Sequence, residues 1–134
     1  MSTAFNAAIL ALLDAGIPLK SILGSVTCII DAQTNQILLD PTAEELSQAK
    51  STHVFVFDNT TSIHVKEETG MDMDQDSAAS SQAAVLFSDS TGLFTEQEYF
   101  ECAHACFKAA QAVHGFIRTA VTKKLEKEYQ QASA

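Results

Sequence analysis

The chain has 134 residues, 46% of them hydrophobic, which fits one folded domain and excludes a chain that is disordered throughout. Its formal net charge of −9 excludes an unassisted nucleic-acid surface, because such a surface needs a basic stripe to neutralise phosphates. Three cysteines without regular spacing favour a reducing compartment, and the apolar opening is too short to span a bilayer, so no membrane partner is expected.

The first expected element is a helix over residues 3–15. Thr3 can serve as its N-cap, Gly16 fits the position just past its end, and Pro18 blocks its continuation. Apolar residues cover nearly the whole circumference of this segment, which predicts a buried central helix.

Apolar and β-branched runs predict a set of strands in the first half of the chain, at residues 22–31, 36–39, 53–58 and 62–67. Gln33-Thr34-Asn35 supplies the turn between the first two strands. Thr42 and Glu45 have the spacing of a capping box, which predicts a short helical turn there.

The second half of the chain begins with residues 67–82, which are acidic and then rich in Ser, Ala and Gln. This composition predicts a solvated loop. A strand at 84–88 and a turn at 89–92 are expected next. A long helix is then expected from Glu96 to about Glu128. Its apolar stripe consists of Tyr99, Ala103, Phe107, Ala110, Val113, Ile117 and Val121.

Cysteines and histidines in this chain look more structural than catalytic. Cys102, His104 and Cys106 resemble a metal cluster, but on a helix His104 points about 200° away from Cys102, so one tetrahedral centre cannot easily collect all three. Buried cysteines beside the apolar stripe, with His104 on the polar side, are therefore expected. Cys28 is expected to be a buried strand residue. None of the four histidines has a nucleophile or carboxylate at a spacing that forces a catalytic triad.

Two groups of carboxylates could bind a cation. The alternating acids of residues 72–76 open like a calcium loop but lack its later glycine and glutamate, which favours a solvated loop. Asp40 with Glu44 and Glu45 follows a strand, where acids can bind a divalent ion or assist proton transfer. The simpler interpretation is that Asp40-Pro41 makes a turn and the glutamates lie in the first turn of a short helix. Residue chemistry alone favours this structural role, and no cofactor or metal site is expected.

Three segments together carry a family resemblance. The helix pattern of residues 6–18, Leu-Leu-Asp-Pro-Thr at 38–42 and Asp-Ser-Thr-Gly-Leu-Phe-Thr at 89–95 resemble the second half of an RNase PH domain, over about residues 4–125. The Leu-Asp-Pro-Thr form and the following strand, 49–58, resemble most the non-catalytic-type subunits of the eukaryotic RNA exosome ring.

The resemblance implies an α+β fold of the RNase PH-like (ribosomal protein S5 domain 2-like) type. Its mixed sheet would pack on a buried first helix and a long C-terminal helix, in a single domain over residues 1–134. The family's phosphate-binding loop belongs to the half that precedes the first helix, so this chain is expected to lack it. The implied partners are other RNase PH-like exosome subunits. RNA would be contacted only through the assembled ring, in the nucleus, nucleolus and cytoplasm.

Active members of the family follow the pattern acid-x-(acid or Asn)-x-x-Glu-acid in the segment after the strand. Asp40 matches the first acid and Glu45 the glutamate, whereas Thr42 and Leu46 replace two other positions. The resemblance thus implies a structural ring subunit with no catalytic residue. One alternative is a phosphorolytic or metal-assisted nuclease, working as a homodimer with phosphate or Mg²⁺ and using Asp40 with Glu44 or Glu45. The other alternative is a protein-interaction module outside the exosome.

Overall fold

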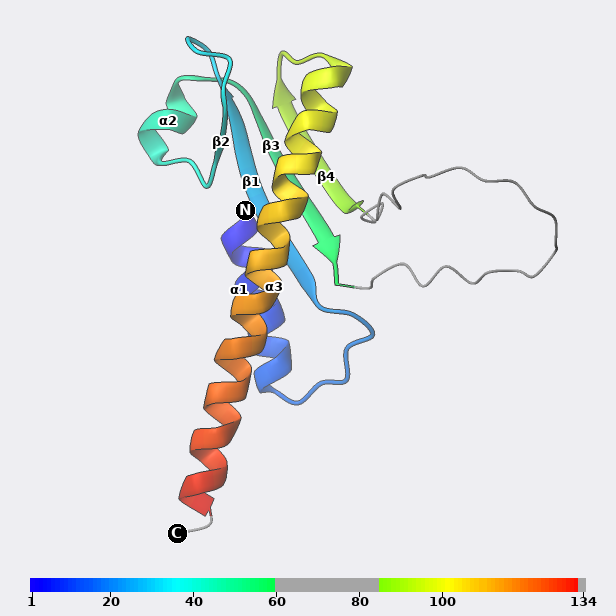
Figure 1. Cartoon of the computed structure of the whole chain (residues 1–134), viewed down its shortest axis with the longest axis vertical. Coiled ribbons are helices and arrows are strands. Elements are labelled where there is room, and N and C mark those ends of the chain that lie inside the picture. Colours follow the sequence, from blue (N-terminus) through cyan, green and yellow to red (C-terminus); the bar gives the residue numbers. More distant parts are fainter. Residues whose placement is uncertain (60–84, 133–134) are drawn as a thin grey trace, which may run out of the picture.

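The computed structural model describes residues 1–59 and 85–132. Its elements in chain order are α1 (Ser2–Asp14), β1 (Leu23–Asp31), β2 (Ile37–Leu39), α2 (Ala43–Ser47), β3 (Ala49–Asp58), β4 (Val85–Gly92) and α3 (Glu96–Ala132) (Figure 1). These elements confirm the α+β fold with a long C-terminal helix. The predicted strand at 62–67 and the acidic loop at 67–82 lie outside the described residues.

The four described strands form one sheet in the order β2-β1-β3-β4. Each neighbouring pair is antiparallel, so the expectation of a mixed sheet is wrong for the described strands. The physical reason lies in the connections: parallel neighbours need a crossover that returns the chain to the same end of the sheet, and here the chain reverses direction between paired strands.

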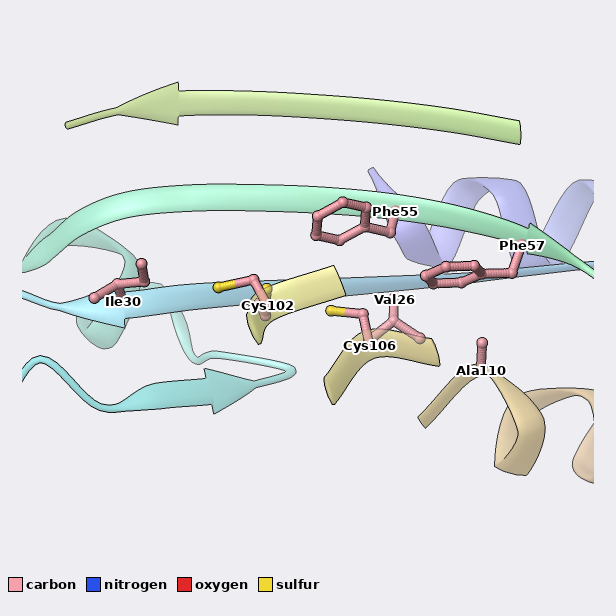
Figure 2. Packing of buried hydrophobic residues seen from close by; sticks show 8 residues of the cluster. Val26, Ile30, Phe55, Phe57, Cys102, Cys106 and Ala110 are labelled. Atoms are coloured by element: carbon pink, nitrogen blue, oxygen red, sulfur yellow. The ribbon is translucent and has the colours of Figure 1, made fainter. Parts of the chain in front are cut away.

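The two faces of the sheet are covered by different helices. Alternate side chains of β1 and β3 point toward α3 and form the main core with it (Figure 2). That core consists of Val26, Cys28, Ile30, Phe55, Phe57, Cys102, Cys106 and Ala110. The opposite face meets α1: Ser2 Oγ lies 2.7 Å from Thr27 Oγ1, and the rings of Phe5 and Phe87 lie 5.6 Å apart.

Helix α1 is held against β1 by the side chain of Asn6, whose amide group forms the pair of hydrogen bonds that another peptide group would form. The Asn6 amide donates to the Ser25 carbonyl oxygen and accepts from the Ser25 N–H, both at 2.9 Å. At the other end, Gly16 adopts a φ of 69°, and its N–H donates to the Leu13 carbonyl while Ile17 N–H donates to that of Leu12. This closure is the left-handed helix ending that glycine favours, as the sequence predicted.

Two predictions about α1 are wrong. The N-cap is Met1, with no side-chain hydrogen bond, rather than Thr3. The helix is also not buried: only Ser2 and Ile9 are buried, and Ala4, Ala7, Ala8 and Ala11 are exposed. An apolar circumference measures how much a helix could bury, whereas β1 covers one side only. Among the described residues, the outer side of α1 remains uncovered.

Strand β4 is longer than expected, because the predicted turn at 89–92 is strand instead. Its pairing with β3 continues to the Ser51–Gly92 register, so residues typical of turns are held in the ladder. Ser90 is also fixed by its hydroxyl, which lies 2.8 Å from His53 Nδ1. Tertiary pairing therefore overrides the local preference of Asp-Ser-Thr-Gly for a turn.

Helix α3 begins with a capping interaction, in which the Glu98 carboxylate accepts from the Thr95 N–H at 2.8 Å. The same carboxylate forms an ion pair with Lys50 of β3 at 2.6 Å, tying the helix start to the sheet. The predicted stripe faces the sheet, but its most buried members are Ala110 and Ile117, with Cys102 and Cys106 beside them. Across the described residues, no helix is long and apolar enough to cross a membrane.

Candidate functional site

Asp40 lies at the end of the short edge strand β2 and reverses the chain. Its φ is 51°, a left-handed conformation that aspartate tolerates better than most residues. Its N–H donates to the Thr27 carbonyl at 2.9 Å, and its side chain is exposed. The turn interpretation of Asp40-Pro41 is therefore confirmed.

The Glu45 carboxylate is occupied by the cap of α2. One of its oxygens accepts from the Thr42 N–H at 2.7 Å and from the Thr42 hydroxyl at 3.0 Å. In return, the Glu45 N–H donates to the Thr42 hydroxyl oxygen at 3.3 Å. The predicted capping box is confirmed, and Glu44 also lies in the first turn of α2. This arrangement uses Glu45 to stabilise a helix terminus.

The candidate acids are not gathered into one centre. Asp40, Glu44 and Glu45 are all exposed, and they line neither of the hollows that measure ≈ 800 Å³ and ≈ 630 Å³. Within the part of the chain that the structure describes, no group of three His, Cys, Asp or Glu side chains is placed to hold a metal ion. The geometry of this segment is thus that of a helix cap and a turn, whereas acid–base or metal-assisted chemistry needs carboxylates that converge on one point.

The three cysteines meet in the core, between β1 and α3. Cys28, Cys102 and Cys106 are fully buried, while His104 is exposed on the other side of the helix, as predicted. The hydrogen bond from Cys102 lowers the pKa of the Cys28 thiol, but its contact with Cys106 and its burial outweigh this effect and raise the pKa to about 12. Contact with Cys28, followed by burial, likewise raises the pKa of Cys102. Protonated, buried thiols are poor nucleophiles and act here as small apolar side chains.

Two histidines are built into the fold. His53 is fully buried, with Nε2 3.0 Å from the Ser51 hydroxyl oxygen and Nδ1 2.8 Å from that of Ser90. The His114 ring lies against Gly24, where a Cβ atom would stand 2.6 Å from Nε2. Burial lowers the pKa of both imidazoles. These positions agree with structural roles, and His64 lies outside the described residues.

Acidification from about pH 7.5 to 5.5 is expected to lower the free energy of unfolding. A histidine in the unfolded chain takes up a proton near its ordinary pKa of 6.5, whereas the buried His53 and His114 take it up only at lower pH. The unfolded state therefore binds more protons over this range, and stability falls as pH falls. Urea unfolding at several pH values checks this. His53→Gln should flatten the pH dependence, and His104→Gln, at an exposed position, is the control against which the flattening is measured.

One feature of the structure was missed by sequence reasoning: a groove of ≈ 630 Å³ between the ends of α1 and α3. Across it, the Lys124 ammonium group contacts the Asp14 carboxylate, and this ion pair raises the pKa of Lys124. The two residues lie 110 positions apart, so no local pattern connects them. The only available signal was the continuation of the apolar row past Val121, to Leu125.

Comparison with known proteins identifies relatives of this fold. Residues 21–109 match the profile of the 3′ exoribonuclease family, domain 2. A rice protein named exosome complex exonuclease RRP46 homolog is 30% identical over 122 residues, which are 90% of this chain and 48% of that protein. The yeast exosome complex component RRP46 is 43% identical over 58 residues, covering 43% of this chain and 26% of the yeast protein.

The crystal structure of rice Rrp46 matches this chain with a TM-score of 0.67 at 26% identity. The match covers 90% of this chain and 47% of the rice chain. The chain thus spans about half the length of the rice relative that it matches. The sequence match and the structural match each cover 90% of this chain.

Proposed function

Because the chain belongs to the 3′ exoribonuclease family, through that family's domain 2, we propose that it is a non-catalytic structural subunit of an RNA exosome ring. In that role it supports 3′-to-5′ RNA processing and degradation without cleaving RNA itself. The similarity to rice and yeast proteins whose names both refer to the exosome complex supports the assembly. The proposed partners are other RNase PH-like subunits of the same ring, in the nucleus, nucleolus and cytoplasm.

The observation that carries the non-catalytic part of the proposal is the capping box at the start of α2. Thr42 stands where active members carry an acid or Asn, and its hydroxyl and N–H engage the Glu45 carboxylate. Leu46 stands at the position of the final acid and is 41% exposed. The segment therefore offers one uncommitted carboxylate from the family pattern, that of Asp40, which cannot by itself replace a converging set.

RNA contact is proposed to belong to the assembled ring. A chain with a net charge of −9 repels phosphate, and the four basic residues near the end of α3 are accompanied by Glu126 and Glu128. The exposed aromatic ring of Phe100 lies in a hollow that also contains Glu96, Glu101 and Lys108, a mixed-charge setting unlike the basic grooves that bind single strands.

The alternative is an active nuclease, because the rice relative carries the word exonuclease in its name. In that case Asp40 with Glu44 or Glu45 would act with phosphate or Mg²⁺. The geometry of α2 gives this alternative less support, since Glu45 already accepts hydrogen bonds at 2.7 and 3.0 Å from Thr42. A homodimer would be the smallest assembly that could complete such a site.

The purified chain is expected to show no phosphate-dependent shortening of a single-stranded RNA, with or without Mg²⁺. Loss of one charge-stabilising group from an active centre typically costs about 10²–10³ in rate, and two positions of the family pattern are changed here. The measurement is gel-resolved RNA length against time, with Asp40→Asn beside the wild type. We expect the same background rate of RNA shortening with the wild type and with Asp40→Asn.

The same preparation tests the ring. Mixed with RNase PH-like exosome subunits, the chain should co-elute with them in size-exclusion chromatography. RNA shortening by the wild-type chain that is lost in Asp40→Asn would contradict the non-catalytic role. Absence of co-elution with each ring subunit tried would contradict the structural one.

A further inference from the structure

The first turns of α3 carry the hollow of ≈ 800 Å³, and an exposed aromatic ring lies in it. Phe100 is 60% exposed, and its ring lies 5.7 Å from that of Tyr99 at an angle of 76°. Glu96 and His104 lie one turn before and one turn after Phe100 on nearly the same side of the helix, and both are exposed. The Phe100 ring therefore offers a partner an open aromatic face beside charged side chains.

Two carboxylates beside this ring have no basic partner in the part of the chain that the structure describes. Glu96 and Glu101 line the hollow, and none of the ion pairs between described residues involves either of them. Glu101 accepts one hydrogen bond from the neutral Gln97 amide, at 3.1 Å, so its charge stays uncompensated. Glu98 differs, because it is already paired with Lys50. The hollow thus begins with an aromatic ring between two negative charges.

The opposite end of the hollow is positive. Lys108 lies there, eight residues after Phe100 and therefore about 12 Å further along the helix axis. The helix dipole adds about half a positive charge at the start of α3, which the two full charges of Glu96 and Glu101 outweigh. A partner therefore fits best when it places a cation at the Glu96 end and an acid at the Lys108 end.

We propose that this hollow binds a segment of a protein partner that carries an arginine followed by an acidic residue. The guanidinium group stacks on the Phe100 ring and donates to the carboxylates of Glu96 and Glu101, while the acid faces Lys108. Arginine suits this place better than lysine, because its planar group stacks on a ring and keeps the N–H groups at its edge free to donate. Nucleic acid is disfavoured, since the same carboxylates repel phosphate.

The first experiment titrates the isotope-labelled chain with the peptide Gly-Ser-Arg-Ser-Gly-Ser-Glu-Ser-Gly and follows its backbone amides by NMR, at roughly 0.15 M salt. In an extended peptide these two charges are about 13 Å apart, close to the span from Phe100 to Lys108. We expect saturating shifts centred on residues 96–108, with a Kd of about 0.1–1 mM. The same peptide with citrulline, which keeps the shape of arginine without its charge, should give no saturable shift. The lysine peptide should bind at least about threefold more weakly than the arginine peptide.

The second experiment repeats the titration with variants of the chain. Phe100→Ala removes the stacking face and Glu101→Gln removes one charge, so each should raise the Kd at least about threefold. Both side chains are exposed, and the Glu98 cap of α3 is kept, so circular dichroism should show the same fold. Phe116→Ala and Glu126→Gln are the matched controls, because they make comparable changes at exposed positions of α3 outside the hollow. These controls should leave the Kd unchanged.

A citrulline peptide that binds as tightly as the arginine peptide would overturn the proposal. So would binding that both Phe100→Ala and Glu101→Gln leave unchanged, or the absence of a saturable shift up to about 10 mM peptide. An oligouridine that shifts the same amides would assign the hollow to nucleic acid instead, and shifts on concentrating the chain alone would assign it to a second copy. The inference does not depend on the proposed ring function, because co-elution with ring subunits is a separate measurement and either can fail alone.

Discussion

Replacing Phe55 by alanine is expected to lower the free energy of unfolding by about 3–5 kcal/mol, the usual cost of removing a fully buried phenyl ring. Phe55 is 0% exposed and lies at the centre of β3, the strand that joins β1 to β4. Its ring lies 5.3 Å from that of Tyr99 and 6.0 Å from that of Phe57. The cavity would therefore open between the sheet and α3, where neighbouring aromatic rings cannot easily collapse to fill it.

The measurement is urea or thermal unfolding followed by circular dichroism. Phe116→Ala is the matched control, since it removes the same atoms from a side chain that is 66% exposed on α3. Its effect should stay within about 0.5 kcal/mol, as at other surface positions. Equal losses in the two variants would show that Phe55 is not at the centre of the core.

Sequence periodicity predicted the elements whose stability comes from their own pattern. The first helix, expected at 3–15, lies at Ser2–Asp14, and the long helix begins at Glu96 as expected. Strand β3 is a partial case. Its alternation begins at His53, but the strand starts at Ala49 because Ser51 pairs with Ile30. Local pattern could not show that partner, which lies 21 positions earlier in the chain.

The burial of α1 could not be predicted from its composition. An apolar circumference shows what a helix can bury, but the covering elements are fixed by the rest of the fold. Here β1 covers the side that carries Ser2, Asn6 and Ile9, and the alanines face outward. The same reasoning explains why the groove beside Leu125 was not found: its two walls come from the two ends of the chain.

The capping box at the start of α2 was predicted correctly because it is a local feature. A capping box involves residues three positions apart, so Thr42 and Glu45 could be assigned from spacing alone. The role of the Asp-Ser-Thr-Gly segment is different, because its conformation depends on β3. The Ser90 hydroxyl lies 2.8 Å from His53 Nδ1, and Gly92 pairs with Ser51 in the ladder; no spacing rule anticipates either contact.

Gly92→Ala is accordingly expected to lower the free energy of unfolding by about 2–4 kcal/mol. Gly92 has a φ of 103°, which side chains rarely adopt, and a Cβ atom there would stand 2.4 Å from the Lys50 carbonyl oxygen and 2.8 Å from Ser51 Cα. Both obstacles are backbone atoms of the central strand β3, so relief requires β4 to part from the sheet just before α3 begins.

Two other glycines separate the cost of backbone conformation from the cost of a steric clash. Gly16→Ala, at a φ of 69° with nothing within 4 Å, should cost about 1 kcal/mol from conformation alone. Gly115→Ala, in α3 with open space around it, should stabilise the chain by about 0.5–1 kcal/mol. Chemical unfolding of the three variants should therefore rank them with Gly92→Ala least stable and Gly115→Ala most stable. A Gly92→Ala variant as stable as Gly16→Ala would mean that β4 does not approach Lys50 this closely, and that the strand pairing up to Gly92 is wrong.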